Sequence, residues 1–127
     1  MNTAEFLQIS SMVVPDREAL VCEGRRITYM EMAQQVNRLA NALLSLGISR
    51  RDKVAVMSLN GPEVIETYYA CARIGATFVP LNYRAKREEI TYMINNSEAA
   101  TMFVGPRYID LVSSLRPELG ACCCLSR

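Results

Sequence analysis

The residues best suited to chemistry form a short basic segment in the second half of the chain. Arg84, Lys86 and Arg87 lie after a predicted strand and before a predicted helix. Ligands of open α/β sheets gather beyond the carboxyl ends of strands, and basic side chains at a helix start can hold a phosphate. The alternative is a solvated basic turn balanced by Glu88 and Glu89, because runs of charge are commonly just exposed.

Other polar residues in this region have simpler explanations. Asn60 follows a predicted strand and is explained by a cap on the next helix, and Asn82 by a turn. Tyr68 and Tyr69 are expected to pack in the core with hydrogen-bonded hydroxyls rather than to act in catalysis. Cys71 is expected in the core too, because the chain has no histidine to activate a thiol nucleophile.

Three consecutive cysteines, Cys122, Cys123 and Cys124, stand near the end of the chain. Neighbouring side chains point in different directions and do not close a tetrahedral metal site, and no histidine can complete one. A recognised C-terminal lipidation box is absent as well. We therefore expect no metal site, and an exposed, oxidation-prone tail is the favoured interpretation.

The first half of the chain predicts a short hairpin and a long amphipathic helix. Two short apolar runs flank a turn at residues 23–25, which indicates the hairpin. Thr28 followed by Glu31 predicts a capping box at the helix start, and Gly47 is placed to end the helix. The apolar residues at helical spacing are Tyr29, Met32, Ala33, Val36, Leu39, Ala40 and Leu43.

The remainder alternates between strands and helices. The predicted strands are 54–59, 77–81 and 99–104, and the predicted helices are 64–74, 87–96 and 106–115. Apolar strands of this kind are typical of a parallel sheet covered on both faces, joined by right-handed crossovers. The helix 64–74 is apolar almost all round and is expected to be buried, and Gly75 is placed to end it. Pro80 predicts that its strand ends there or lies at a sheet edge.

Composition excludes several classes of function. The 127 residues carry a net charge of +1, so no broad attraction to nucleic acid or anionic membranes is expected. No apolar run approaches the roughly 20 residues of a membrane helix, and the first residues do not resemble a secretory signal. The cytoplasm is the expected setting.

An ordered set of short elements then carries a family resemblance. These elements are residues 27–31, 39–40, 46–48, 52–56, Asn60 with 62–63, 75–76 and 79–82. In the order and spacing of these elements, the chain resembles the N-terminal segment of the AMP-forming acyl-CoA synthetases. Within that family it is more similar to fatty- or aryl-acid CoA ligases than to adenylation domains. The resemblance covers about residues 15–116, between a lead (1–14) and an irregular cysteine-rich tail (117–127). It implies an α/β fold with a parallel sheet and alternating helices, an incomplete N-terminal subdomain preceded by the hairpin.

Two stretches depart from the family pattern. Arg51 stands where the family often has glycine, which we interpret as a tolerable surface change. Residues 120–127 match no family continuation and look detached from the strand–helix alternation.

The resemblance also implies a two-step reaction for a full-length relative. A carboxylic acid and ATP give an acyl-adenylate and pyrophosphate, and the thiol of CoA then displaces AMP. ATP, magnesium and CoA are thus implied for that relative, and Arg84, Lys86 and Arg87 become candidates to contact a CoA phosphate. The phosphate loop, the two later acidic motifs and the late catalytic lysine of the family are absent here. We therefore assign this chain no catalytic residue and no cofactor of its own.

Three interpretations remain. The first is a catalytically inert fragment or short form of the ligase. The second is a non-catalytic module that binds CoA weakly or associates with the missing remainder or with a full-length ligase through apolar faces left exposed. The third is an unrelated nucleotide-binding domain, which the lack of any glycine fingerprint disfavours.

Overall fold

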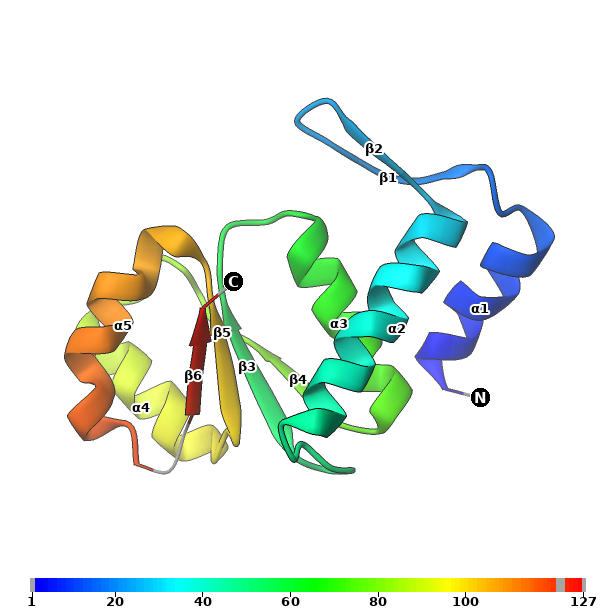
Figure 1. Cartoon of the computed structure of the whole chain (residues 1–127). Coiled ribbons are helices and arrows are strands. Elements are labelled where there is room, and N and C mark those ends of the chain that lie inside the picture. Colours follow the sequence, from blue (N-terminus) through cyan, green and yellow to red (C-terminus); the bar gives the residue numbers. More distant parts are fainter. Residues whose placement is uncertain (1, 121–122, 127) are drawn as a thin grey trace. The chain divides into compact units, whose positions relative to one another are not determined.

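A computed structural model describes residues 2–120 and 123–126 of the chain (Figure 1). The chain forms two compact units, residues 1–50 with 60–75 and residues 51–59 with 76–127. The first unit holds α1 (Thr3–Val13), β1 (Glu18–Cys22), β2 (Arg25–Thr28), α2 (Tyr29–Ser45) and α3 (Pro62–Ile74). The second holds β3 (Lys53–Met57), β4 (Thr77–Pro80), α4 (Arg87–Ser97), β5 (Thr101–Val104), η1 (Pro106–Tyr108), α5 (Ile109–Leu115), η2 (Arg116–Glu118) and β6 (Cys123–Ser126).

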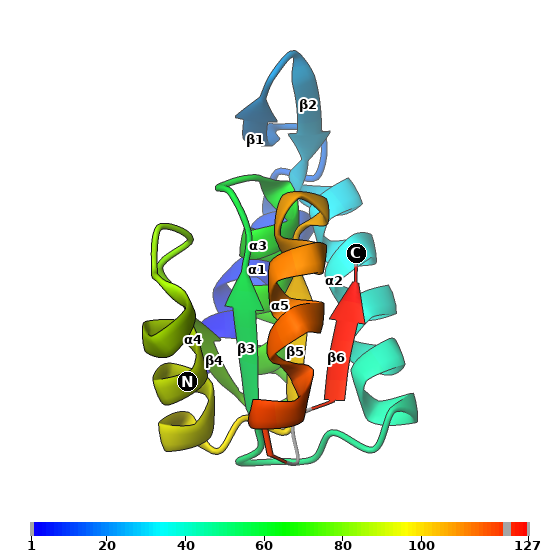
Figure 2. The same ribbon diagram turned by 90° about the vertical axis from the view of Figure 1, so that its left-hand side faces the viewer.

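The second unit is built on a parallel sheet. Its strands lie in the order β4-β3-β5-β6, and every neighbouring pair is parallel. Helices α4 and α5 cover one face of this sheet (Figures 1 and 2). The chain leaves β3 for β4 on one side and returns to β5 on the other, so the sheet has a topological switch point between β3 and β5. The predicted parallel α/β architecture is confirmed.

The core of the second unit lies between the sheet and these two helices. Its buried members are Ala55, Met57, Leu81, Ile90, Ile94, Ala99, Met102, Val104, Val112, Leu115 and Leu119. Ile90 and Ile94 are four residues apart and therefore share one face of α4. Burial of this apolar surface is the main force that positions α4 and the loop before it.

The position of Pro80 follows from the strand pairing. The backbone N–H of Thr77 donates to Asp52 O at 2.8 Å, and that of Leu81 donates to Val56 O at 2.8 Å. Residues alternate along a strand, so the nitrogen of residue 80 faces away from β3 and its missing proton costs no sheet hydrogen bond. Pro80 was predicted to end its strand or to lie at a sheet edge, and both hold, because β4 ends at Pro80 and is an edge strand of the described sheet.

The first unit consists of three mutually contacting helices and a hairpin. Glu23 and Gly24 form the hairpin turn with φ of 48° and 80°, the positive values that a two-residue type I′ turn requires. The apolar faces of the helices meet in a core that includes Leu7 of α1, Leu43 of α2 and Ala70 of α3.

The predicted capping box of α2 is confirmed. The N–H of Glu31 donates to Thr28 Oγ1 at 3.2 Å, and the N–H of Thr28 donates to Glu31 Oε2 at 2.9 Å. Gly47 and Gly75 follow α2 and α3 with φ of 86° and 78°, as expected of glycines that end helices.

One helix was not predicted, and one expectation about a helix is wrong. Residues 3–13 of the predicted lead form α1, which begins at an Asn2 cap and buries Ala4, Leu7 and Ser11. Helix α3 is buried on one face only, because Ile65 and Tyr68 are 37% and 39% exposed. Its buried face instead carries polar residues such as Thr67, whose hydroxyl donates to Glu63 O at 2.7 Å.

The expectation of a detached tail at residues 120–127 is also wrong. Residues 123–126 form β6, which pairs with β5 in parallel, with residue 123 opposite Thr101. The strand–helix alternation therefore continues one element further than the sequence indicated. Cys122 and the side chains of Cys123 and Cys124 lie outside the described part of the structure, so the expected exposure and oxidation of the cysteine tail stay predictions.

Arg51 has a backbone conformation that glycine adopts more easily. It is exposed, as predicted, but its φ is 74°, in the left-handed region. Replacing Arg51 with glycine should stabilise the protein by about 0.5–1 kcal/mol, since relief of about 1–2 kcal/mol exceeds the chain entropy of glycine, about 0.5–1 kcal/mol. Urea unfolding measures the change. Arg51→Ala is the matched control, because alanine keeps the Cβ; equal stability of both variants would contradict the explanation.

Candidate functional site

The predicted basic segment lies in the loop that joins β4 to α4. Asn82 organises this loop, because its Oδ1 accepts from Arg84 N at 2.9 Å and its carbonyl accepts from Ala85 N at 3.0 Å. This is a side-chain-stabilised turn, so the turn interpretation of Asn82 is confirmed. The turn places Arg84 and the start of α4 beyond the carboxyl end of β4.

The three basic side chains have different surroundings. The guanidinium carbon of Arg84 lies 5.5 Å from the ring centroid of Tyr83, a cation–π distance. The Tyr83 ring lies 6.4 Å from that of Tyr108, which links the loop to η1. Lys86 is the N-cap residue of α4, and its backbone N–H donates to Glu89 Oε2 at 2.6 Å.

Arg87 is held by α5. Its Nη1 donates to Ser114 Oγ at 2.7 Å, and that hydroxyl donates to Leu111 O at 2.6 Å. This chain of hydrogen bonds fastens the first turn of α4 to α5. Arg84 and Lys86 therefore have side chains better placed than Arg87 to meet an anion from solvent.

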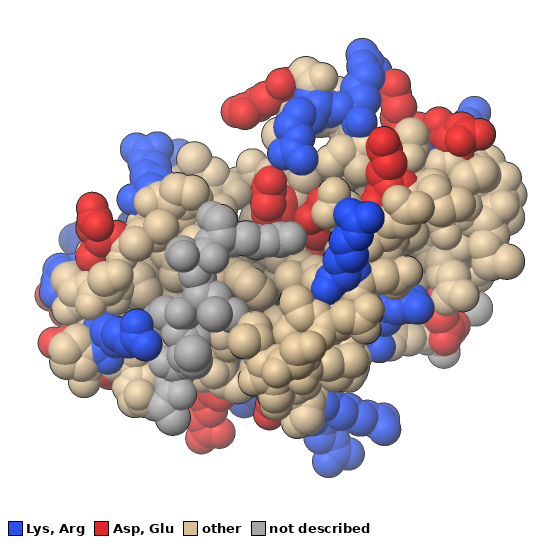
Figure 3. Space-filling model, in the orientation of Figure 1, with Lys and Arg blue, Asp and Glu red and all other residues tan. Residues whose placement is uncertain are grey.

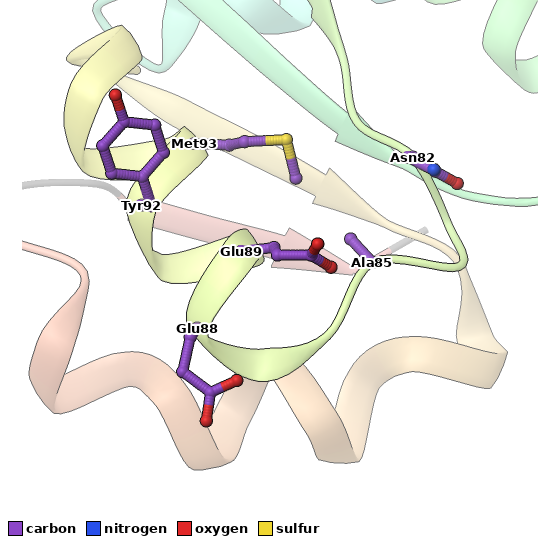
Figure 4. Close-up of a pocket in the computed structure, with 6 residues that line it drawn as sticks. All are labelled: Asn82, Ala85, Glu88, Glu89, Tyr92 and Met93. Atoms are coloured by element: carbon purple, nitrogen blue, oxygen red, sulfur yellow. The ribbon is translucent and has the colours of Figure 1, made fainter.

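A groove beside this loop has the opposite electrostatic character (Figure 4). It has a volume of about 410 Å³ and is lined by Asn82, Ala85, Glu88, Glu89, Tyr92 and Met93. Two carboxylates and no lysine or arginine belong to this lining. The two carboxylates disfavour a phosphate in the groove, so the basic side chains offer a better surface for an anion on the side of the loop away from the groove.

The carboxyl ends of β3 and β5 meet at the switch point of the sheet, which the sequence did not identify as a site. Gly105 N donates to Met57 O at 2.8 Å, and a Cβ on Gly105 would lie 2.7 Å from Ser58 Oγ. The signal available in the sequence was the Gly105–Pro106 pair directly after a predicted strand. Arg107 follows in η1 and is exposed, so it adds a cation at the edge where open α/β sheets bind ligands.

The buried position of Cys71 makes its thiol unreactive. It is 0% exposed, and burial raises the pKa of its thiol to about 12. Because the thiolate is the nucleophile, iodoacetamide should not label Cys71 in the folded protein at pH 8, although it should after denaturation. Peptide mass mapping measures this, with half-buried Cys22 as the internal comparison. Labelling of Cys71 as fast as that of Cys22 would contradict the buried position.

The tyrosines of α3 differ from expectation. Tyr68 is exposed, although it was expected in the core, and its ring meets that of Tyr69 edge-to-face with centroids 5.2 Å apart.

Among the described residues, no group of three or more histidine, cysteine, aspartate or glutamate side chains could hold a metal ion. In the same part of the chain, no helix is long and apolar enough to cross a membrane.

Charges of both signs are interspersed on the surface. The face shown in Figure 3 carries basic and acidic side chains scattered between uncharged areas. The hairpin has two glutamates, Glu18 and Glu23, and two arginines, Arg25 and Arg26. Two ion pairs are formed there, Arg26 with Glu18 at 2.7 Å and Arg25 with Glu63 at 3.3 Å. Both are largely exposed and so contribute little to stability.

These features define a class of protein: a parallel α/β segment with a basic loop beyond a strand end. The family model described as AMP-binding enzyme matches residues 7–125. The chain therefore belongs to the AMP-binding enzyme family, and the resemblance found in the sequence is confirmed.

Three individual relatives show how much of a full-length protein this chain matches. Indoleacetate–CoA ligase of Aromatoleum aromaticum is 33% identical over 119 residues, which are 94% of this chain and 23% of that protein. The solved fatty acyl CoA synthetase of Mycobacterium tuberculosis superposes with a TM-score of 0.95 at 26% identity, over 99% of this chain and 26% of that one. The N-terminal subdomain of Klebsiella oxytoca NpsA superposes with a TM-score of 0.84 at 29% identity, over 98% of this chain and 30% of that one. The fold is thus that of the N-terminal subdomain of acyl-CoA ligases, and the chain spans about a fifth of the length of the curated relatives it matches.

Proposed function

We propose that this chain is the opening segment of an AMP-forming acid–CoA ligase and is catalytically inert by itself. The parent reaction converts a carboxylic acid, ATP and CoA into an acyl-CoA, AMP and pyrophosphate. The observation that carries the proposal is the family match over residues 7–125, together with relatives of which this chain spans only about a fifth. A cytoplasmic setting suits a reaction that consumes ATP and CoA.

The residues present do not fit ATP and magnesium. An adenylating site needs backbone donors and a lysine around the phosphates and carboxylates for the metal. The 127 residues contain no glycine-rich phosphate loop, and the described ones bring no three metal-ligating side chains together. We therefore assign the chain no step of the adenylation.

CoA is a different case, because one of its phosphates requires only exposed cations. Arg84 and Lys86 offer exposed basic side chains on the loop after β4, and Arg87 stands beside them although it is bonded to Ser114. We assign a CoA phosphate to the outer side of this loop. The role proposed for the chain in the parent enzyme is to hold this loop and the neighbouring strand ends in place.

A chimera tests the proposal. Residues 7–125 would replace the matching segment of indoleacetate–CoA ligase, and formation of indoleacetyl-CoA would be measured. We expect a folded chimera to retain ligase activity, and an Arg84→Ala, Lys86→Ala version to show a raised KM for CoA with little change for ATP. A chimera that melts like the parent ligase but makes no product would contradict the proposal.

One observation favours a second candidate function, a binding module. Helix α1 exposes four large apolar side chains on one side, Phe6, Ile9, Met12 and Val13, with exposed fractions of 57%, 49%, 75% and 72%. Contiguous apolar surface of this kind commonly marks an interaction site. Co-purification with a full-length ligase that is lost in Phe6→Ser/Met12→Ser protein would support this role. Absence of both co-purification and CoA binding would count against it.

A further inference from the structure

Helix α4 carries a groove next to its core-facing side, because Met93 and Ala85 line the groove and also pack against the core. The lining residues Glu88, Glu89, Tyr92 and Met93 follow the spacing of one helical face, whereas Ile90 and Ile94 face the core. Asn82 and Ala85 of the preceding loop close the groove on its other side. We call this feature, with its volume of about 410 Å³, the α4 groove.

The floor of the α4 groove is apolar. Figure 4 shows Met93 reaching from α4 toward Asn82, with Ala85 on the facing loop. Tyr92 stands at one end and is 67% exposed, an unusual position for a large aromatic ring. Methionine adapts its shape to different apolar partners, and exposed tyrosines are frequent anchors of protein interfaces.

The rim of the α4 groove is acidic. Both glutamates lie on the first turn of α4, where Glu89 points toward Ala85 and Glu88 points away from it (Figure 4), and no basic residue is among the lining residues. Of the neighbouring cations, Arg84 lies over Tyr83 and Arg87 donates to Ser114. Lys86 is the N-cap residue of α4, and its backbone N–H occupies one oxygen of Glu89, Oε2, at 2.6 Å. An apolar floor that ends at two carboxylates complements a side chain with an aliphatic stem and a positive head, as in lysine and arginine.

We propose that the α4 groove docks a segment of another protein that presents an apolar side chain next to a lysine or arginine. The apolar side chain contacts Met93 and Tyr92, and the basic head reaches Glu88 and Glu89. This proposal is independent of the ligase function, because it uses neither the basic loop surface nor the strand ends at the switch point.

Methionine methyl NMR on the full 127-residue chain tests the proposal. The chain has seven methionines, and Met93→Leu assigns the Met93 signal. The probes are two synthetic peptides of equal length, one alternating leucine pairs with lysine pairs and one with glutamate in place of lysine. We expect the lysine peptide to shift the Met93 signal in a saturable, salt-sensitive manner, and the glutamate peptide and the Met12 signal to show no such change.

Variants with matched controls locate the contact. Glu88→Lys should weaken binding of the lysine peptide by about threefold to fivefold, and Tyr92→Ser by about fivefold or more. Asp110→Lys makes the same charge change at an exposed position of α5, and Phe6→Ser removes an exposed aromatic ring from α1; both should bind like the unchanged chain. Circular dichroism verifies folding, and Glu88→Gln serves if the charge reversal disturbs the first turn of α4.

Three results would overturn the proposal. Equal shifts with both peptides would show that the carboxylates do not select the partner. Equal shifts at Met12 and Met93 would show unspecific apolar association. A response to hexylammonium as strong as the response to the lysine peptide would make the α4 groove a site for small cations rather than for a protein segment.

Discussion

Replacing Ile90 with alanine is expected to lower the free energy of unfolding by about 2–5 kcal/mol. Ile90 is 0% exposed and belongs to the core between α4 and the parallel sheet. Truncation removes its apolar contacts and leaves a cavity that the surrounding strands cannot fully close. Urea unfolding followed by circular dichroism measures the loss.

The control for Ile90 stands two residues away on the same helix. Tyr92→Ala removes a larger side chain that is 67% exposed, so its effect should stay within about 0.5 kcal/mol. Native-state hydrogen exchange adds a second readout, because the loss of protection should concentrate in the unit of residues 51–59 and 76–127. Similar losses for both variants would mean that α4 does not pack on the sheet as described.

Replacing Gly105 with alanine should destabilise the protein by about 1–3 kcal/mol through overpacking. The backbone of Gly105, with φ of −63° and ψ of 149°, suits any residue, so the cost is steric rather than conformational. The new Cβ would lie 2.7 Å from Ser58 Oγ, 3.2 Å from Ser58 Cβ and 3.3 Å from Ser58 Cα. Either the carboxyl ends of β3 and β5 move apart or Ser58 has to shift.

A double-mutant cycle separates this contact from a general effect of alanine. Ser58→Ala removes the closest atom, so Gly105→Ala should cost less in that background, although the 3.2 Å contact with Cβ remains. Gly61→Ala is the comparison, because its Cβ would meet only the flexible end of Glu63 at 3.1 Å. Additive effects of Ser58→Ala and Gly105→Ala would show that the two strand ends are not in contact.

The sequence predicted those parts of the fold that depend on local chemistry. Thr28 and Glu31 form the capping box through their own hydrogen bonds. Gly47 and Gly75 end helices because glycine adopts a positive φ easily, and Pro80 lies in an edge strand because it lacks an N–H. Strands β3, β4 and β5 were recognisable because parallel strands form continuous apolar runs.

One local prediction is wrong, because Gly61 rather than Asn60 is the N-cap of α3 and no side chain caps that helix. The other errors concern non-local interactions. Strand β6 exists through its pairing with β5, and its Cys-Cys-Leu-Ser sequence has little strand character alone. The exposure of Tyr68 and the burial of Thr67 were hidden because α3 is apolar on several sides, so periodicity does not fix the inner face. The left-handed φ of Arg51 was not predicted, although the glycine that the family often has at this position was the available signal.

The candidate site was predictable only in part. The basic loop after β4 was found from its residue types, but the bond between Arg87 and Ser114 joins residues 27 positions apart and left no local signal. The acidic character of the α4 groove likewise depends on which side of the helix Glu88 and Glu89 face. The residue types therefore indicated which segment is charged. Only the packing of α4 showed on which side of the helix each charged side chain lies.

Carboxylate-dependent exchange of labelled pyrophosphate into ATP tests the central claim most directly, because it detects adenylate formation without CoA. The purified 127-residue chain would be assayed with acetate, a long-chain fatty acid and indoleacetate, and full-length indoleacetate–CoA ligase would serve as the positive control. We predict exchange at the level of the no-protein blank for this chain with every acid. Exchange that depends on the added carboxylate and co-purifies with the chain would contradict the account.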